Sequence, residues 1–172
     1  MIGYLDEAEA LRGIDPATVE LVNGVGSIGT RQSQMNRRKV YERLTAVDFR
    51  FAVLTHPSAV IAQAVVLEPG CVVMAGVIIQ TRVRVGANTI VNTGAIVDHD
   101  CVLGRHAHIA PGAVLSGSVV AEDDSHVGTG ARVIQGVRIG VGAVVGAGAT
   151  VVSDVPSNSL AIGTPARPAR KN

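Results

Sequence analysis

The sequence is poor in aromatic residues, in cysteine and in net charge. It has two tyrosines, two phenylalanines and no tryptophan, so its hydrophobic core must be built from Val, Ile, Leu and Ala. A formal net charge of +1 argues against a general nucleic-acid-binding protein. Cys71 and Cys101 lack the spacing of a metal or disulfide motif, and we expect two buried thiols. No apolar run approaches the ~20 residues of a membrane span, and no signal-peptide pattern is found, so we expect a cytoplasmic protein.

What the sequence does contain is a repeat of six residues. Large aliphatic residues recur at every sixth position over 61–151, and Ala121 is the only exception. A second column of small or β-branched residues begins at Cys71, and a third column holds glycines from Gly70 to Gly148. Hexapeptide repeats are a signature of a parallel β-helix, in which the aliphatic residues fill the interior and glycine serves the corners. The sequence therefore predicts a mainly β fold.

The first 55 residues do not follow this repeat and predict a small α/β subdomain. A helix is expected over 31–46, with Val40, Tyr41 and Leu44 on one side. The expected strands cover 1–6, 19–26 and 50–54.

Two short motifs occur in this N-terminal part. Gly24, Gly26 and Gly29 form a GxGxxG pattern between a strand and a helix, which fits either a phosphate-binding loop or a plain strand-to-helix turn. The pattern alone is weak, and the plain turn is favoured. The basic run over 37–39 predicts a solvated helix face.

Residues 53–172 resemble sugar acetyltransferases of the sialic acid O-acetyltransferase and bacillosamine N-acetyltransferase type. The resemblance rests on THPSA at 55–59, NTGAIVDHDC at 92–101, a histidine at 108 nine places after His99, and GTPAR at 163–167. It implies a left-handed parallel β-helix with three hexads in each coil, acetyl-CoA as the acyl donor, no metal and a homotrimer. The expected organisation is a partial, Rossmann-like subdomain over 1–55, the β-helix over 56–156 and a C-terminal tail over 157–172.

The chain departs from the family pattern at its N-terminus. Family members begin with a further strand and a GxGGH-like loop that helps to hold the nucleotide sugar, whereas this sequence starts at what reads as the second strand. We therefore expect either a truncated subdomain or a different way of binding the sugar. Asp6 and Glu7 are the only candidates left for nucleotide contacts.

Residues 18 positions apart should stack in successive coils of such a β-helix. This spacing places His99 between Thr81 and Gly117. Glycine at that position leaves space beside the imidazole and exposes a backbone N–H. By the same arithmetic Arg82 stacks with Asp100, and the two are expected to pair.

The resemblance implies roles for these residues. His99 is expected to be the general base and Asp100 the acidic neighbour that tunes it. An imidazole, with an ordinary pKa near ~6.5, suits the removal of a proton from an amine or hydroxyl that attacks a thioester. The residues implied to contact acetyl-CoA are His108, Gly117 through its N–H, Thr129 and Ala147, and Asn92 matches a polar residue near the sugar.

The remaining histidines and the basic tail complete the candidate residues. His108 should stack with His126. His106 and His126 are expected at the surface, and His56 is interpreted as structural, at the entry to the first coil. Arg167, Arg170 and Lys171 fit either contacts with CoA phosphates or a frayed basic terminus.

Three functions remain open. The leading one is acetyl-CoA-dependent transfer, directly and without a covalent intermediate, to an amino or hydroxyl group of a nucleotide-linked sugar or a sialic acid. The second is a γ-carbonic-anhydrase-like zinc enzyme, which needs three converging imidazoles. His108 and His126 supply two of them, but His99 lies half a coil away. The third is a non-catalytic β-helix that serves as an oligomerisation scaffold.

Overall fold

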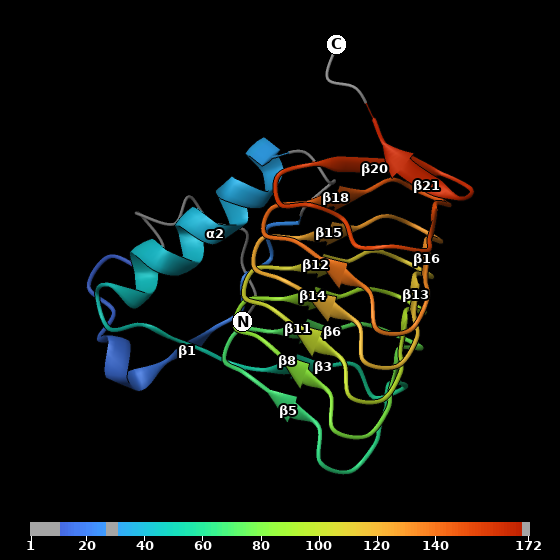
Figure 1. Ribbon diagram of the computed structural model, residues 1–172. Coiled ribbons are helices and arrows are strands. Elements are labelled where there is room, and N and C mark those ends of the chain that lie inside the picture. The colour runs from blue at the N-terminus through green and yellow to red at the C-terminus, as the bar shows by residue number, and fades with distance from the viewer. Residues whose placement is uncertain (1–10, 27–30, 170–172) are drawn as a thin grey trace.

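Short strands wind into a parallel β-solenoid of about six turns in the computed structural model, which describes residues 11–26 and 31–169 (Figure 1). The strands form three long sheets. Sheet I comprises β3 (Leu54–Thr55), β6 (Val72–Val73), β9 (Ile90–Val91), β12 (His108–Ile109), β15 (His126–Val127), β18 (Val144–Val145), β20 (Leu160–Gly163) and β21 (Ala166–Pro168). Sheet II comprises β4 (Val60–Ile61), β7 (Ile78–Ile79), β10 (Ile96–Val97), β13 (Val114–Leu115), β16 (Arg132–Val133) and β19 (Thr150–Val151). Sheet III comprises β5 (Val66–Leu67), β8 (Arg84–Val85), β11 (Val102–Leu103), β14 (Val120–Ala121) and β17 (Arg138–Ile139).

The strand register confirms the predicted coil of three hexads. In sheet II, Ile96 pairs with Ile78 on one side and with Val114 on the other, each 18 positions away. The solenoid strands pair in parallel, and only the terminal hairpin of β20 and β21 pairs antiparallel. Each coil therefore places one strand in each sheet, and every sixth residue returns to an equivalent position.

The hexad repeats because each short strand is followed by a sharp corner. The second residue of a strand faces inward, as Val97 and Ile109 do with no exposed surface. The corner then needs a residue in the left-handed region, such as Gly94 (φ 66°) or Asp100 (φ 61°). Glycine adopts this conformation without a steric penalty, and aspartate is among the few other residues that tolerate it.

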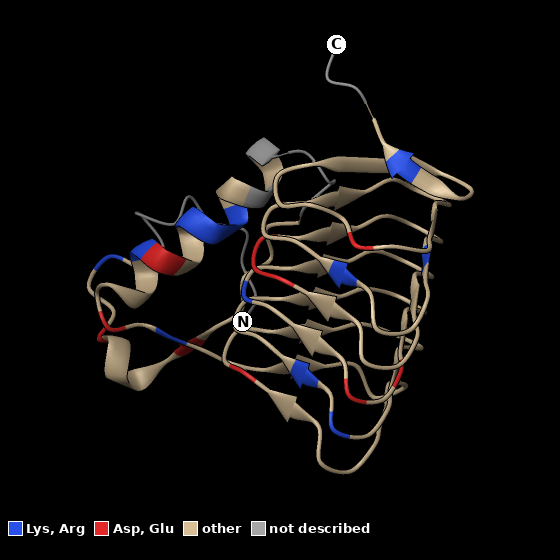
Figure 2. Cartoon of the chain, in the orientation of Figure 1, with Lys and Arg blue, Asp and Glu red and all other residues tan. Residues whose placement is uncertain are grey.

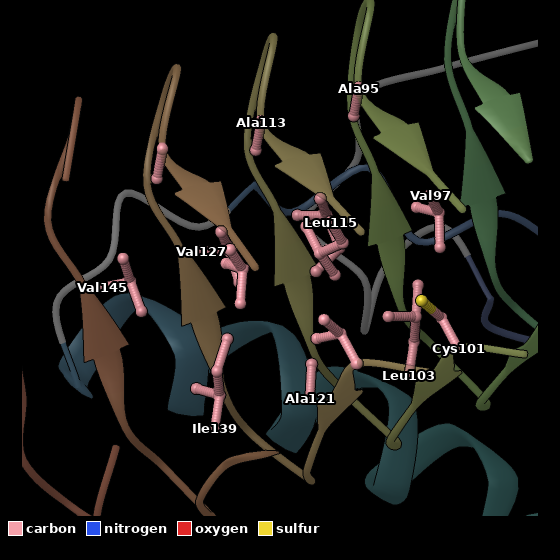
Figure 3. Packing of buried hydrophobic residues seen from close by; sticks show 14 of the residues in the cluster. Ala95, Val97, Cys101, Leu103, Ala113, Leu115, Ala121, Val127, Ile139 and Val145 are labelled. Carbon is pink, nitrogen blue, oxygen red and sulfur yellow. The ribbon is translucent and has the colours of Figure 1, made fainter. Parts of the chain in front are cut away.

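The interior of the solenoid consists of the two predicted residue columns. Figure 3 shows aliphatic side chains from successive coils meeting along the axis, with alanines beside them. Ala121, the exception in the aliphatic column, is also fully buried. Cys71 and Cys101 are buried and unpaired, so the prediction of two buried thiols is confirmed.

The N-terminal part forms a small α/β unit beside the solenoid (Figure 1). It contains a 3₁₀ turn (Pro16–Thr18), β1 (Glu20–Leu21), α2 (Arg31–Thr45) and β2 (Arg50–Phe51), with β1 and β2 paired in parallel. The predicted helix is confirmed. The third predicted strand is shorter than expected, because β2 ends at Phe51 and the following β3 pairs with β6 of the solenoid. The strand expected over 1–6 lies outside the described residues.

Helix α2 packs on one corner of the solenoid through aromatic residues. The Tyr41 ring lies 4.6 Å from the Phe51 ring and 5.6 Å from the His106 ring, between ring centroids. Arg38 extends from the helix to Asp124 of the solenoid at 2.6 Å. The helix therefore covers the corner that follows sheet III.

Arg37 shows that the prediction of a solvated basic face was wrong at this position. Its side chain is only 4 % exposed. The guanidinium donates to the backbone oxygens of Asn23, Val25 and Asn88. Desolvation lowers its pKa to about 10. Arg37 thus ties helix α2, the loop after β1 and the solenoid together.

Charged residues elsewhere are spread over the surface (Figure 2). Helix α2 carries mostly basic residues and one acidic residue, Glu42, whereas most solenoid strands carry no charge. Within the described ranges, no helix is both long enough and apolar enough to cross a membrane.

Candidate active site

The corner after β10 holds His99 in a fixed orientation. Its ring Nδ1 lies 2.7 Å from Oδ2 of Asp100, the next residue. Its backbone N–H donates to Oδ1 of Asp98 at 2.7 Å. The left-handed φ of Asp100 turns the chain so that neighbouring side chains meet. The imidazole is half exposed, so it is both oriented and accessible.

Asp100 is in turn held from the coil below. Arg82 contacts both carboxylate oxygens of Asp100, through Nε at 2.6 Å and Nη2 at 2.8 Å. The predicted stacking and pairing of these two residues are confirmed. The hydrogen bonds from Arg82 and then from His99 hold the pKa of Asp100 well below its usual range. An ionised carboxylate can only accept hydrogen bonds, so the proton of a neutral His99 ring lies on Nδ1 and the lone pair on Nε2.

Gly117 lies directly against the His99 ring in the coil above. A Cβ atom at this position would approach Cε1 of His99 to 2.6 Å and Nε2 to 2.7 Å. A backbone hydrogen bond joins the two coils beside this contact, because the N–H of Ser118 donates to the carbonyl of His99 at 2.8 Å. The predicted stacking of Gly117 on His99 is therefore observed, and only glycine leaves the ring in this position.

The second group of predicted site residues lies on sheet I. His108 is buried, and its Nε2 lies 3.1 Å from Nδ2 of Asn92. Its ring meets the ring of His126 edge to face, with centroids 4.9 Å apart. Two residues assigned from the resemblance to different partners, Asn92 to the sugar and His108 to acetyl-CoA, are therefore direct neighbours.

Thr129 and Ala147 continue this group along the corner that follows sheet I. The N–H of Gly148 donates to the Thr129 carbonyl at 2.8 Å, which stacks the two corners. Gly128 lets the coils approach, because a Cβ there would meet the Ala147 nitrogen at 2.7 Å. Both predicted contact residues are exposed and form one stripe.

The structure does not join the two groups within one chain. His99, Asp100 and Gly117 occupy the corner between sheets II and III. Asn92 directly follows a strand of sheet I, and His108 lies on the outer face of that sheet. Sheet II separates them.

The prediction that His106 and His126 lie at the surface was wrong. His106 is buried under Tyr41, and its Nδ1 lies 2.9 Å from Nδ2 of Asn88. His126 is equally buried, and desolvation lowers its pKa to about 4. Within the described residues its Nδ1 has no hydrogen-bond partner. The hexad places both residues correctly along the coil but carries no information about which outer faces are covered.

The other predicted residues show no role in either group. His56 is exposed at the first coil, where its Nδ1 lies 2.8 Å from the hydroxyl of Ser58. Arg167 lies in β21, and Arg170 and Lys171 lie outside the described residues. Gly29 of the GxGxxG pattern also lies outside them. Among the residues that the structure describes, no three His, Cys, Asp or Glu side chains are grouped as metal ligands.

The solenoid, its hexad and the histidine-bearing corner define a hexapeptide-repeat protein. A model of the family "Bacterial transferase hexapeptide (six repeats)" matches residues 82–117. The acetyltransferase domain of PglB from Neisseria gonorrhoeae is 36 % identical, with a TM-score of 0.87, and the match covers 94 % of this chain and 77 % of that one. This chain therefore belongs to the hexapeptide-repeat transferase family, whose left-handed β-helix it shares.

Other relatives are also sugar N-acetyltransferases. Perosamine N-acetyltransferase from Caulobacter crescentus, solved as a histidine-to-asparagine mutant with CoA and GDP-perosamine, is 42 % identical with a TM-score of 0.79. The match covers 80 % of this chain and 66 % of that one. GDP-perosamine N-acetyltransferase from Escherichia coli O157:H7 is 33 % identical over 93 residues, 54 % of this chain and 42 % of the relative. The chain thus spans less than half the length of the curated relatives it matches.

Proposed function

We propose that this protein transfers an acetyl group from acetyl-CoA to the amino group of a nucleotide-linked amino sugar. The observation that carries the proposal is the corner at His99, where Asp100 fixes the ring and Gly117 leaves it uncovered. The relatives support the choice of an amine over a hydroxyl, because several are named as N-acetyltransferases. A structure of the PglB domain with acetyl coenzyme A supports the choice of donor.

In the proposed reaction His99 is the general base. Its Nε2 takes a proton from the sugar amine as the amine nitrogen attacks the thioester carbonyl carbon. The new C–N bond forms while the C–S bond breaks, and the thiolate of CoA leaves and takes up a proton. Acetyl-CoA supplies the activated acyl group, and no covalent intermediate on the protein is needed. Asp100 keeps the Nδ1 proton in place, so that Nε2 remains the basic nitrogen.

The negative charge that develops on the thioester oxygen needs a fixed donor. We assign this role to the backbone N–H of Gly117, which lies in the strand-end segment packed against the His99 ring. A backbone donor is already oriented before the reaction, so no reorganisation is required when the charge forms.

The residues on sheet I are assigned to binding. His108, Thr129 and Ala147 are proposed to contact acetyl-CoA, and Asn92 the sugar. Because these residues lie across sheet II from His99, we propose that a site combines His99 of one chain with His108 of its neighbour. A homotrimer of parallel solenoids provides such a contact at each of its interfaces. We also propose that the enzyme acts in the cytoplasm.

The test is thiol release from acetyl-CoA in the presence of nucleotide-linked amino sugars, with mass spectrometry to find the acetylated product. The matched acceptors are the same nucleotide sugar with a hydroxyl in place of the amine, and free sialic acid. Wild-type protein should acetylate the amine only, and His99→Ala should reduce the rate by about 10²-fold or more.

The control variant is His56→Ala, which removes an exposed imidazole of the first coil, outside both groups of site residues, and should keep full activity. Release with the hydroxyl analogue or sialic acid alone would correct the acceptor class. Absence of release with every acceptor, or full activity of His99→Ala, would refute the proposed function.

A further inference from the structure

The charged side chain next to the proposed base is itself held by a third residue. We propose that Arg82 is a positioning residue, which acts through Asp100 to keep the proton of His99 on Nδ1 and the lone pair on Nε2. The inference rests on the proposed function, since it concerns the base of that reaction. Arg82 is an addition to that function, because its observed hydrogen bonds go to Asp100 and not to His99.

The placement of Arg82 follows from the repeat. Arg82 and Asp100 are 18 positions apart and occupy equivalent corners of successive coils, both with left-handed backbones (φ 59° and 61°). The N–H of Asp100 donates to the carbonyl of Thr81 at 3.1 Å, which fixes the distance between the two corners. A long side chain at 82 therefore reaches a carboxylate at 100 without any change in the backbone.

The carboxylate of Asp100 accepts hydrogen bonds from two partners, Arg82 and His99. Oδ1 of Asp100 accepts from Arg82 Nε, and Oδ2 accepts from both Arg82 Nη2 and His99 Nδ1. With both oxygens held by a planar fork, the carboxylate cannot rotate away from the imidazole. The ion pair also keeps Asp100 ionised, so it accepts from Nδ1–H and cannot donate to Nδ1.

A contribution to global stability does not explain this arrangement. The side chains of Arg82 and Asp100 are 62 % and 36 % exposed, and exposed ion pairs contribute little to folding. The pair is nevertheless bidentate, with short contacts on both arms, next to the one histidine that Gly117 leaves uncovered. The consequence of the pair is therefore local, at His99.

Other charged groups near His99 do not replace Arg82. Asp98 accepts from the backbone N–H of His99, not from its ring. Arg84, two positions after Arg82 and equally exposed, points to Glu68 at 3.9 Å. Arg84 therefore provides a matched control, because it has the same side chain and charge but no contact with Asp100.

The decisive measurement is the tautomer of the neutral His99 ring, obtained from two-bond ¹H–¹⁵N spectra of ¹⁵N-labelled protein at a pH where histidines are neutral. The His99 signals are assigned by their absence in His99→Ala. Wild type and Arg84→Gln should show the proton on Nδ1. Arg82→Gln should show a mixture of tautomers, and Arg82→Lys should retain most of the Nδ1–H form. Asp100→Asn, whose amide can donate to Nδ1, should move the proton to Nε2 and mark the other limit.

Kinetics provide a second readout. Arg82→Gln should lower kcat by roughly tenfold, a fraction of the full effect of a general base, with the KM for acetyl-CoA within about twofold. Arg84→Gln should leave both values unchanged, and thermal unfolding should show that all variants are folded.

An unchanged tautomer in Arg82→Gln would overturn the inference, as would an equal change in Arg84→Gln. If no acceptor is acetylated by wild type, the proposed function fails, while the spectra still decide whether Arg82 sets the state of His99.

Discussion

Gly117→Ala is the smallest change that tests the geometry of the proposed site. Gly117 does not have a left-handed backbone, so alanine is compatible with its conformation. The three atoms nearest to the added methyl group all belong to the imidazole of His99, whose Cε1 and Nε2 lie 2.6 and 2.7 Å from the Cβ position. The substitution therefore displaces the proposed base without removing it.

The size of the effect follows from these distances. Ordinary van der Waals contact begins at 3.4 Å, so the ring must retreat by about 0.8 Å. A misplacement of about 1 Å can reduce a rate by about 10²-fold, which corresponds to about 2.7 kcal/mol of activation free energy. We expect kcat/KM to fall between tenfold and a hundredfold. The ring is half exposed and can swing into solvent, so the free energy of unfolding should change by less than about 0.5 kcal/mol.

The assay is acetyl transfer to the nucleotide-linked amine, combined with urea unfolding of each variant. The control is a double-mutant cycle with His99→Ala. If the methyl group acts only by moving the ring, Gly117→Ala should have no further effect in the His99→Ala background.

Two outcomes would refute this reasoning. Full activity of Gly117→Ala would show that the position of the ring against Gly117 is irrelevant to the chemistry. An equal loss in both backgrounds would show that the methyl group acts on something other than His99, such as the path of the substrate.

The remaining predictions concern stability. Burial lowers the pKa of His126 to about 4, whereas the unfolded ring titrates near ~6.5, so unfolding takes up a proton between these values. The contribution of His126 should be fully present above pH ~6.5 and fall by roughly 3 kcal/mol toward pH ~4. In urea titrations His126→Phe should reduce the acid loss of stability by about this amount, whereas His56→Ala should retain the full loss. The part that remains in His126→Phe is expected from His106, whose pKa is also lowered by burial. Arg37→Met leaves three backbone acceptors unpaired and should lower the free energy of unfolding by about 3 kcal/mol in the same assay. A variant as stable as wild type would show that Arg37 does not hold the helix against the solenoid. Leu103→Ala should cost about 2–5 kcal/mol, whereas Val102→Ala on the outer face of the same strand should cost less than about 0.5, and equal losses would mean that the inward and outward positions are misassigned.

The solenoid could be predicted from the sequence because its repeat is strict. A coil of fixed length turns a sequence spacing into a spatial one, so Arg82 with Asp100, His99 with Gly117 and His108 with His126 are found stacked as the arithmetic requires. The same spacing also predicts that His99 and His108 lie half a coil apart. Local chemistry and the repeat together were sufficient for these contacts.

The N-terminal part could not be predicted to the same depth. The sequence correctly predicts helix α2, but it also predicts a solvated Arg37, and this residue is buried. Its hydrogen bond to the Asn88 carbonyl joins positions 51 apart in sequence, with no repeat to relate them. The same docking buries His106, which the hexad alone places on an open corner.

The sequence by itself thus determined the architecture and the composition of the corner at His99, because in a solenoid each residue contacts mainly the equivalent residues of the next coil. Tertiary structure decided which outer faces are covered, how Arg82 divides the carboxylate of Asp100, and that sheet II lies between the two groups of site residues. These features depend on side-chain directions and on the packing of segments that share no period. A repeat fixes the neighbours of a residue along the coil, whereas only the folded chain fixes what lies against its outer face.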